Sequence, residues 1–226
     1  MEKDVESVID TDENQFYSKA KIYWSKVSPT INGVLGGFGH ISECDINGSE
    51  LFLKSLFQLK NPPGNGRALD CGAGIGRITK HLLIKHFQLV DLIDQNSDFV
   101  EKAKEYVSSD RLGKLYCNGL QCFKPEEKYD VIWCQWVLGH LTDEHFKQFM
   151  ENCLESLNKN GVIVVKENIT SSNEIDVDEE DSSITRPYDH LLKLFEESRL
   201  KCILKQQQTS FPKGLYPVKM FALRPV

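Results

Sequence analysis

The order of apolar and polar positions along this 226-residue chain predicts an α/β fold. From about residue 65 onward, short β-like runs alternate with helical ones, a pattern typical of βαβ units around a mostly parallel sheet. Predicted strands cover 67–71, 89–94, 114–117, 129–135, 161–166, 201–207 and 216–223. Predicted helices cover about 75–87, 98–107 with a capping box of Asp98 and Glu101, 142–157 with Thr142 as N-cap and an end at Asn160-Gly161, and 188–198.

The first 60 residues follow a different pattern. Residues 1–13 are acidic and aperiodic, which predicts a mobile tail. Apolar residues then recur on one helix face from Phe16 to Val27, and this helix is expected to end before Pro29. Glycines crowd residues 31–40, which favours a loop, and a second helix is expected at about 47–59. We therefore divide the chain into 1–60, a tail and helical lid, and 61–226, the α/β domain.

Composition narrows the classes of partner. The 33 acidic residues exceed the 27 basic ones and give a net charge of -6, which disfavours nucleic acid and anionic lipid and favours a basic partner. The N-terminus lacks a secretory signal pattern and the longest aliphatic run is 162–165, so no membrane segment is expected. Seven cysteines without a C-x-x-C pair argue against disulfides and a metal site; several are expected as reduced core thiols.

The motif that carries chemistry follows the first predicted strand. Gly72, Gly74 and Gly76 form a G-x-G-x-G turn that leads into a helix, whose N-terminal N–H groups are free to bind a ligand. The third glycine arrives one residue too early for the G-x-G-x-x-G of dinucleotide binding. Asp94 ends the next strand, 18 positions after Gly76, where a carboxylate can accept both ribose hydroxyls. Together these residues indicate a nucleoside cofactor.

Several further motifs support a closer resemblance. They are Tyr23-Trp24, 33–41, 69–80, 119–121, 129–133, 135–136, 139–142 and 181–183. With them, the chain resembles the protein α-N-terminal methyltransferases, which are class I S-adenosylmethionine-dependent enzymes. That family methylates the exposed α-amine of proteins that begin Xaa-Pro-Lys after removal of Met. The resemblance runs from about residue 14 to 185 and becomes thin beyond Arg186.

The resemblance implies a cofactor site. The residues that match the family's cofactor contacts are Trp24, Gly72, Gly74, Arg77, Asp94, Gln95, Leu120, Gln121 and Gln135. Arg77 would pair with the methionine carboxylate, and Asp94 would bind the ribose. Leu120 and Gln121 follow the third strand of the domain and would enclose the adenine.

The resemblance also assigns Asp181 and His140 as the catalytic pair. An α-amine with a pKa of about 7.7–8.0 is neutral in roughly one molecule in ten at pH 7, so a modest base is sufficient. A lysine amine near 10.4 costs about 4–5 kcal/mol to deprotonate at the same pH. An alternative reading of His140, a histidine beside a helix that is bonded to backbone, stays open.

The implied substrate contacts are Leu35, Trp136, Asn168, Asp178, Ser183 and Tyr216. Six of the eight residues from Glu174 to Asp181 are acidic, within a predicted substrate loop at 168–186, and they would receive the basic residues of a substrate. Trp136 would face an ammonium by cation–π attraction. Leu35, Tyr23, Trp24 and Tyr216 would wall the channel for the substrate's proline.

We therefore expect a class I methyltransferase with a seven-stranded, mostly parallel sheet, helices on both faces, an antiparallel last strand and an N-terminal helical lid. S-adenosyl-L-methionine is the expected cofactor, without a metal, and the enzyme is expected to be a monomer of nucleus and cytoplasm. The alternatives are methylation of another amine or a nucleic acid, a non-catalytic reader of basic N-termini, and an NAD-dependent oxidoreductase. Glu167, where better-studied members have Asp, and Cys134, where they have an aliphatic residue, leave the size of the substrate and the number of methyl groups open.

Overall fold

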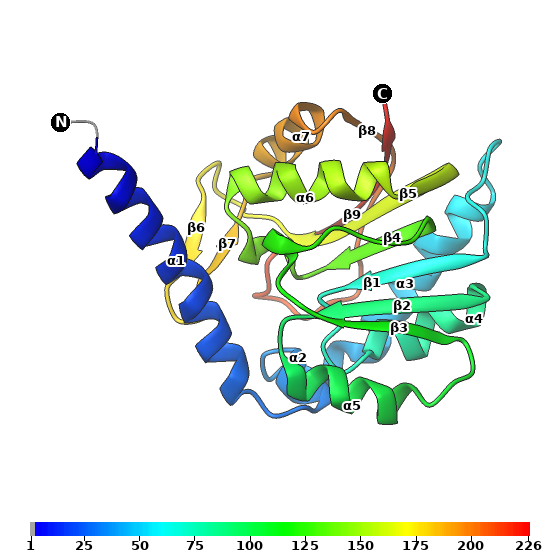
Figure 1. Ribbon diagram of the computed structural model, residues 1–226. Coiled ribbons are helices and arrows are strands. Elements are labelled where there is room, and N and C mark those ends of the chain that lie inside the picture. The colour runs from blue at the N-terminus through cyan, green and yellow to red at the C-terminus, as the bar shows by residue number, and fades with distance from the viewer. Residues whose placement is uncertain (1–2) are drawn as a thin grey trace.

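The computed structural model describes residues 3–226, with side chains from Glu13 onward. A single twisted sheet lies at its centre, and helices pack on both of its faces (Figure 1). Helix α1 crosses one end of the sheet, next to the small hairpin β6–β7. None of the described helices is long and apolar enough to cross a membrane.

The central sheet has seven strands in the order β3-β2-β1-β4-β5-β9-β8. Its strands are β1 (Arg67–Cys71), β2 (Leu89–Asp94), β3 (Leu112–Cys117), β4 (Tyr129–Gln135), β5 (Leu157–Asn168), β8 (Leu200–Gln207) and β9 (Val218–Pro225). Strands β1 to β5 are parallel, while β9 runs antiparallel to both β5 and β8. The predicted seven-stranded sheet with an antiparallel last strand is confirmed.

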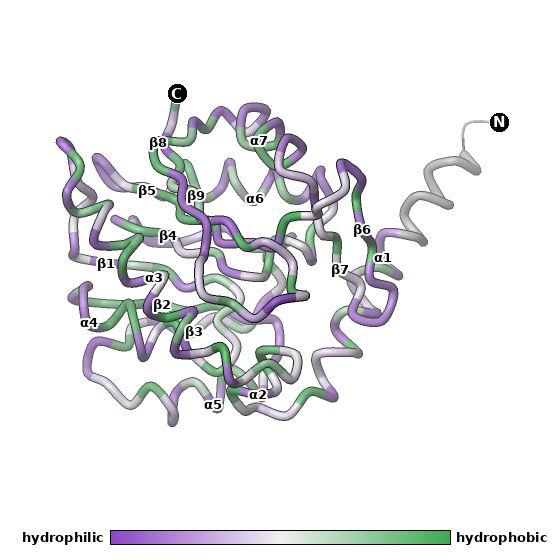
Figure 2. The backbone as a smooth tube through the Cα atoms, turned by 180° about the vertical axis from the view of Figure 1, so that it is seen from behind, coloured by the Kyte–Doolittle hydropathy of each residue, from purple (hydrophilic) through white to green (hydrophobic). Residues whose placement is uncertain are grey.

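The core is divided between the two faces of this sheet because successive side chains in a strand point to opposite sides. Leu69, Ile132 and Ile163 pack on one face against α6 (Asp143–Glu155) and α7 (Tyr188–Glu197). Ala68, Val131 and Val162 pack on the other, against α3 (Ser42–Phe57) and the turn η2 (Thr79–Leu83). Both faces are covered, which explains why the central strands read as continuous apolar runs, coloured green in Figure 2.

Three of the seven cysteines belong to this core; of the other four, Cys44 is partly buried and three are exposed. Cys71, Cys134 and Cys153 are buried free thiols, which confirms the expected core thiols, whereas Cys117, Cys122 and Cys202 are exposed.

The N-terminal segment is more helical than the sequence predicts. Helix α1 covers Lys3–Lys26, so the prediction of an aperiodic tail over 1–13 is wrong from Lys3 onward; residues 1 and 2 lie outside the described residues. The glycine-rich stretch holds α2 (Ile31–Val34) and the 3-10 turn η1 (Gly39–Ile41) instead of a continuous loop. Thr30 caps α2 by accepting a hydrogen bond from the Gly33 N–H, a local contact that outweighs the helix-breaking tendency of the glycines.

The remaining helices differ from their predictions mainly at the ends. Helix α3 begins at Ser42, five residues earlier than expected. Helix α5 (Ser97–Val107) is capped by Asn96, which accepts from the Asp98 N–H, so the predicted capping box of Asp98 and Glu101 is wrong. Helix α6 has the expected cap at Thr142, but it ends at Glu155 because the chain turns at once into a longer β5.

The helix expected at 75–87 is also altered. It holds the π-helical turn η2 followed by α4 (Ile84–His86). Such turns are rare and occur frequently near functional sites. Here the turn follows directly after the glycine motif, and the buried carboxylate of Asp70 accepts from the N–H and the hydroxyl of Thr79 at 2.9 and 2.6 Å.

Two features at the carboxyl edge of the sheet come from segments predicted as loops. Residues 168–186 contain an antiparallel hairpin of β6 (Asp176–Asp178) and β7 (Ser183–Thr185). The 3-10 turns η3 (Leu120–Cys122) and η4 (Leu138–His140) follow β3 and β4. These elements form the wall and the rim of the site described below.

Gly76 shows why the glycine motif admits no side chain. Its φ is +77°, in the left-handed region, and a Cβ atom there would lie 2.6 Å from Cγ2 of Val107 on α5. Backbone strain and a side-chain clash therefore coincide at this position.

We predict that Gly76→Ala lowers the free energy of unfolding by about 2–4 kcal/mol, since strain and overpacking each contribute about 1–3 kcal/mol. Adding Val107→Ala removes the clash but not the strain, so the double variant is expected to lose less than the sum of the single losses. Urea denaturation measures all three. Gly36→Ala is the control for strain alone, because Gly36 has a φ of +57° and a Cβ atom there would have no atom within 4 Å. If the loss of stability in the double variant equalled the sum of the losses of Gly76→Ala and Val107→Ala, there would be no clash between these residues.

Candidate active site

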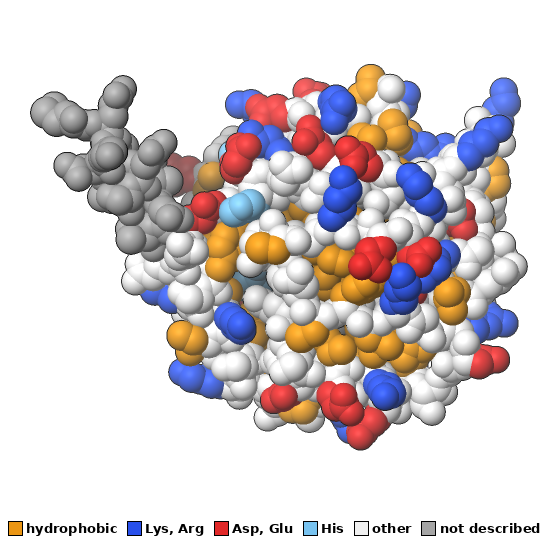
Figure 3. Space-filling model, viewed as in Figure 1, with side chains coloured by type: hydrophobic (Ala, Val, Ile, Leu, Met, Phe, Trp, Pro, Cys, Tyr) orange, Lys and Arg blue, Asp and Glu red, His pale blue; other side chains and the backbone are white. Residues whose placement is uncertain are grey.

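A pocket opens at the carboxyl ends of β1, β2, β3 and β4, where open α/β sheets bind ligands. Its empty volume is about 980 Å³ when the open solvent at its mouth is included. Helix α1 and the loop that holds α2 form its outer wall through Trp24 and Leu35. Figure 3 shows the surface hollowed between α1 and the strand ends, with hydrophobic side chains at the rim.

The floor of the pocket is the glycine motif. At Gly72, φ is +65° and a Cβ atom would lie 2.3 Å from Cγ2 of Val137. Asp94 faces this turn from the end of β2 and accepts from the N–H groups of Gly74 at 2.8 Å and Asn96 at 2.9 Å. Burial raises the pKa of Asp94, while these backbone donors lower it. The carboxylate is thus held in a fixed orientation at the pocket, with acceptor capacity left for hydroxyl groups.

A buried cluster of charges supports the next part of the wall. Asp45 on α3 is fully buried and pairs with Arg77 at 2.7 Å and with the Nζ of Lys166 at 2.5 Å. The side-chain amide of Gln135 donates to both carboxylate oxygens of Asp45 at 2.9 Å. Burial lowers the pKa of Lys166, and the Asp45 carboxylate raises it. Lys166 also donates to the side chain of Gln208 at 2.8 Å.

This cluster fits a ligand that carries a carboxylate. Arg77 and Lys166 bring two positive charges and Asp45 brings one negative charge. The buried carboxyl of Asp70, whose pKa burial raises to about 7, also lies near Arg77 and is only partly ionised at pH 7, so part of a positive charge is left over beside the pocket that Arg77 lines. A ligand carboxylate would balance that charge in a site where charges interact strongly. Gln135 also lines the pocket, but its amide is engaged by Asp45 and by the indole N–H of Trp133 at 3.1 Å, which makes it part of the support for the wall.

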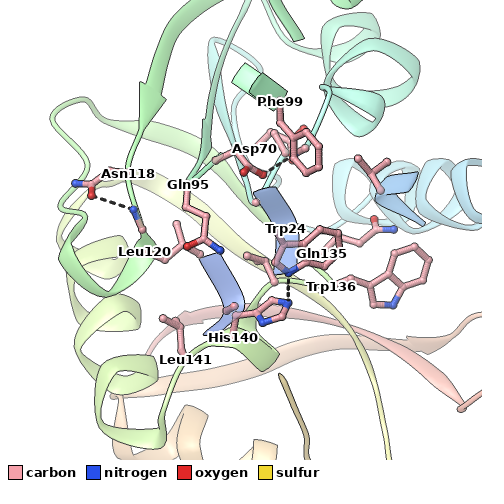
Figure 4. Close-up of a pocket in the computed structure, with 18 of the residues that line it drawn as sticks. Trp24, Asp70, Gln95, Phe99, Asn118, Leu120, Gln135, Trp136, His140 and Leu141 are labelled. Carbon is pink, nitrogen blue, oxygen red and sulfur yellow. Dashed lines mark hydrogen bonds between the residues drawn. The ribbon is translucent and has the colours of Figure 1, made fainter. Parts of the chain in front are cut away.

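The other end of the pocket is less polar. Leu120 and Gln121 at η3 line it together with Gln95, as the resemblance implies. Phe99 from α5 and Asn118 after β3 join them (Figure 4). Leu120 and Phe99 offer apolar contacts to a ring system such as a purine, and the amides of Gln95, Asn118 and Gln121 can bond its polar edge. The pocket lining therefore presents a carboxylate partner, a hydroxyl partner and contacts for an aromatic ring, which fits S-adenosylmethionine.

His140 lies at the rim, where it meets α1. Its Nε2 atom accepts from the indole N–H of Trp24 at 3.1 Å (Figure 4). Its Nδ1 atom lies 3.3 Å from the carbonyl oxygen of Ser182. Burial lowers the pKa of His140, opposed by the charges of Asp181 and Asp178. The alternative reading of His140 as a histidine bonded to backbone is correct for Nδ1, yet the ring also faces the pocket.

Asp181 lies close enough to act electrostatically on both His140 and Tyr23. Its Oδ1 atom is buried and has no hydrogen-bond partner among the described residues. A buried carboxylate oxygen without a donor is costly unless a ligand supplies one. This atom is therefore a ready acceptor for an N–H group that enters the site.

The turn that carries His140 is held from below. Glu167 at the end of β5 accepts from the N–H groups of Val137 and Leu138, both at 2.9 Å, and burial raises its pKa to about 7. The guanidinium of Arg186 donates to the carbonyls of Leu138 and Leu141 at 3.1 and 2.6 Å. Glu167 and Arg186 therefore fix the backbone on either side of His140.

The structure distributes the predicted substrate residues over two places. Leu35 and Trp136 line the pocket itself. Asn168, Asp178, Ser183 and Tyr216 lie outside its lining, at the end of β5, on the hairpin β6–β7 and in the loop before β9. The Tyr216 hydroxyl donates to Asp176, so this loop reaches the hairpin. None of the ion pairs among the described residues involves the acidic run at 174–181.

Trp136 is more constrained than the sequence suggests. It follows the end of β4 as expected, with Trp133 fully buried, but its φ of +52° is unusual for a large residue. Arg77 and Lys166 lie 6.0 and 5.8 Å from the centre of its ring. The ring therefore already interacts with two cations of the protein, which leaves less of its π system for a substrate ammonium.

Sequence reasoning missed part of the site. Asp45 and Lys166 form the charge cluster but belong to no motif, and Val137 and Phe99 complete the walls. The sequence does contain a sign of the role of Lys166, because an ionisable residue at the end of an apolar strand needs a buried partner. It contains no comparable sign for Asp45. Among the described residues, no group of three or more His, Cys, Asp or Glu side chains is arranged to hold a metal ion.

We predict that Asp45→Ala destabilises the protein by about 3–5 kcal/mol, because it leaves buried cations without their partner. Lys166→Met combined with Asp45→Leu is expected to regain part of this loss, since it removes one of the two buried cations that Asp45→Ala leaves unpaired, while Arg77 stays unpaired. Chemical denaturation measures the stability of both variants. Lys54→Met, which removes an exposed ion pair with Glu50, is the matched control and should change stability by less than about 1 kcal/mol. A loss for Asp45→Ala no larger than that of the control would contradict this account.

Comparison with known proteins supports the same chemistry. Residues 12–224 match the family described as AdoMet dependent proline di-methyltransferase. The chain is similar to the N-terminal Xaa-Pro-Lys N-methyltransferase 1-A of Xenopus laevis, with 48% identity over 94% of this chain and 97% of that protein. It is 47% identical, with the same coverage, to the N-terminal Xaa-Pro-Lys N-methyltransferase 1 of Homo sapiens.

Solved structures agree with these sequence comparisons. A SAM-dependent methyltransferase from Leishmania major matches with a TM-score of 0.87 and 41% identity over 92% of this chain and 83% of that one. The DhpI–SAH complex, at 15% identity and a TM-score of 0.67, shares the fold alone over 93% of this chain and 96% of that one. The chain belongs to the family of AdoMet-dependent proline dimethyltransferases.

Proposed function

We propose that this protein transfers methyl groups from S-adenosylmethionine to the free α-amino group of proteins that begin Xaa-Pro-Lys. The observation that carries the proposal is the buried, unpartnered Oδ1 of Asp181 beside His140, at the rim of a pocket suited to the cofactor. This acceptor matches an α-ammonium group, which offers N–H donors and a positive charge.

The acidic hairpin supports a basic substrate. The side chains from Glu174 to Glu180 are exposed, and no ion pair among the described residues neutralises them. The hairpin β6–β7 of this segment lies beside α1 (Figure 1). A lysine in the third position of a substrate can reach such a surface when its first residue lies at Asp181, because two residues span about 7 Å.

The protein's own part in the reaction is alignment and removal of one proton. When bound, S-adenosylmethionine would supply an electrophilic methyl group carried on a sulfonium. Arg77 would bind the carboxylate of the cofactor and Asp94 would bind its ribose hydroxyls. Trp24 and Leu35, which form the outer wall of the pocket, would exclude water. Asp181, which lies beside His140 at the rim, would bind the amine and lower the cost of its neutral form.

A peptide that begins Ser-Pro-Lys is expected to gain mass in steps of one methyl group when it is incubated with the protein and S-adenosylmethionine. The same peptide with an acetylated N-terminus should gain none, since its lysine amine costs about 4–5 kcal/mol to deprotonate at pH 7. Mass spectrometry of both peptides decides the matter. Binding without a gain of mass would favour a reader of basic N-termini, and methylation of the acetylated peptide would point to another amine.

Asp181→Asn is expected to reduce kcat by about 10²–10⁴-fold, the usual range for loss of a general base. The affinity for S-adenosylmethionine should change little, because Asp181 does not line the pocket. Calorimetric titration with the cofactor and steady-state kinetics with the peptide separate the two effects. Asp189→Asn, on the exposed side of α7, is the matched control. An equal loss of affinity and rate in Asp181→Asn would count against its role as base.

Two expectations from the sequence stay predictions. They are that the protein acts as a monomer and that it is found in nucleus and cytoplasm.

A further inference from the structure

The hydrogen bonds of His140 determine its protonation form without reference to any ligand. An indole N–H is a donor only, so Nε2 of His140, which faces Nε1 of Trp24 at 3.1 Å, must present a lone pair. A backbone carbonyl is an acceptor only, so Nδ1, which lies 3.3 Å from the oxygen of Ser182, must carry the proton. The Ser182 contact requires a proton on Nδ1, and the Trp24 contact excludes one on Nε2, so the two contacts together require the neutral Nδ1–H tautomer.

This tautomer has no lone pair left for a substrate. Protonation at Nε2 would place two N–H groups opposite each other and would break the bond to Trp24. Among the described residues, Asp181 Oδ1 is the one buried carboxylate oxygen without a hydrogen-bond partner. It is therefore the acceptor that remains available at this rim.

We propose that Trp24 is a positioning residue that holds His140 in its neutral Nδ1–H form and thereby leaves Asp181 Oδ1 as the atom that takes the proton from the substrate's α-ammonium. The catalytic part of this inference rests on the proposed function. The step breaks one N–H bond of the ammonium and forms one O–H bond on Asp181, and the nitrogen keeps the electron pair. The half-exposed Asp181 then releases the proton to water.

The position of Trp24 is itself secured, which makes it suitable for this role. The carbonyl of Trp24 accepts from the side-chain amide of Asn96 at 2.8 Å, and its ring packs edge-on against Phe99 and His140. One contact thus ties the end of α1 to the loop after β2, the second ties it to α5, and the third reaches His140. The lid formed by α1 and the proton-accepting group are therefore parts of one arrangement.

Other charged groups near His140 act on it from defined sides. Asp181 and Asp178 on the hairpin favour its protonated form, and burial opposes it. Arg186 binds the carbonyls of Leu138 and Leu141 on either side. Since the two carboxylates favour protonation, loss of the Trp24 bond should let His140 bind a proton more readily.

The tautomer can be tested by ¹⁵N NMR on the protein labelled at histidine, without cofactor or peptide. The chain has six histidines, and His140→Gln assigns the signal. We expect Nδ1 of His140 to be protonated and Nε2 to be unprotonated at pH 7. In Trp24→Phe the pKa of His140 should rise by about 0.5–1 unit, the value of one hydrogen bond. A protonated Nε2 in the unsubstituted protein, or an unchanged pKa in the variant, would overturn the proposal.

A control separates this effect from general loosening of α1. Tyr17→Phe removes hydroxyl contacts from α1 to Thr142 and His145 but leaves Trp24 in place. It should not change the His140 spectrum. If Trp24→Phe does not fold, the spectrum of the unsubstituted protein still decides the tautomer.

Kinetics with the peptide test the choice of proton acceptor. In His140→Gln, the amide oxygen can replace Nε2 as the acceptor for the indole N–H of Trp24. If His140 is not the proton acceptor, this variant should keep a kcat at least about tenfold higher than that of Asp181→Asn. The opposite order would make His140 the acceptor and refute the assignment. A protein that methylates no peptide but shows the expected tautomer would refute the proposed function and leave the role of Trp24 standing.

Discussion

A single buried carboxylate organises the carboxyl edge of this sheet. Asp45 is fully buried on α3 and holds Arg77, Lys166 and Gln135, which come from three different parts of the chain. A buried charge of this kind is tolerated only when its partners are all in place. The cluster therefore forces α3, the helix after the glycine motif and the ends of β4 and β5 into one arrangement, and the surplus positive charge of that arrangement suits it to an anionic group of a ligand.

The reactive rim is built on top of this framework by short, well-supported turns. Glu167 and Arg186 fix the backbone around η4, which carries His140, and α1 closes over it through Trp24. The charges on the two sides of the pocket suit two different ligands. The cations of Arg77 and Lys166 lie beneath the pocket and an acidic hairpin lies outside it, so a cofactor carboxylate and a basic substrate are attracted to opposite sides of the reacting atoms.

Much of the fold, and the part of the site that depends on local sequence, could be predicted from the sequence. The strand, the three glycines and Asp94 lie within 28 residues and depend on local backbone geometry, so Gly72, Gly74 and Asp94 line the pocket as predicted. Helix ends were less predictable: Thr142 caps α6 as expected, whereas Asn96 replaced Asp98 as the cap of α5. The glycine-rich stretch at 31–40 formed two short helical turns because Thr30 supplied a cap that composition alone did not reveal.

The sequence by itself determined which chemistry is possible here, since motif spacing reflects what adjacent residues can do: a glycine turn before a helix binds a polar ligand, and an acidic strand end binds hydroxyls. Tertiary structure alone decided which atoms are engaged and which are free. Trp24 and His140 are 116 residues apart, and Lys166 lies 121 residues from Asp45. Contacts over such separations are set by the packing of whole elements, and they decide that His140 is occupied while Asp181 keeps an open oxygen.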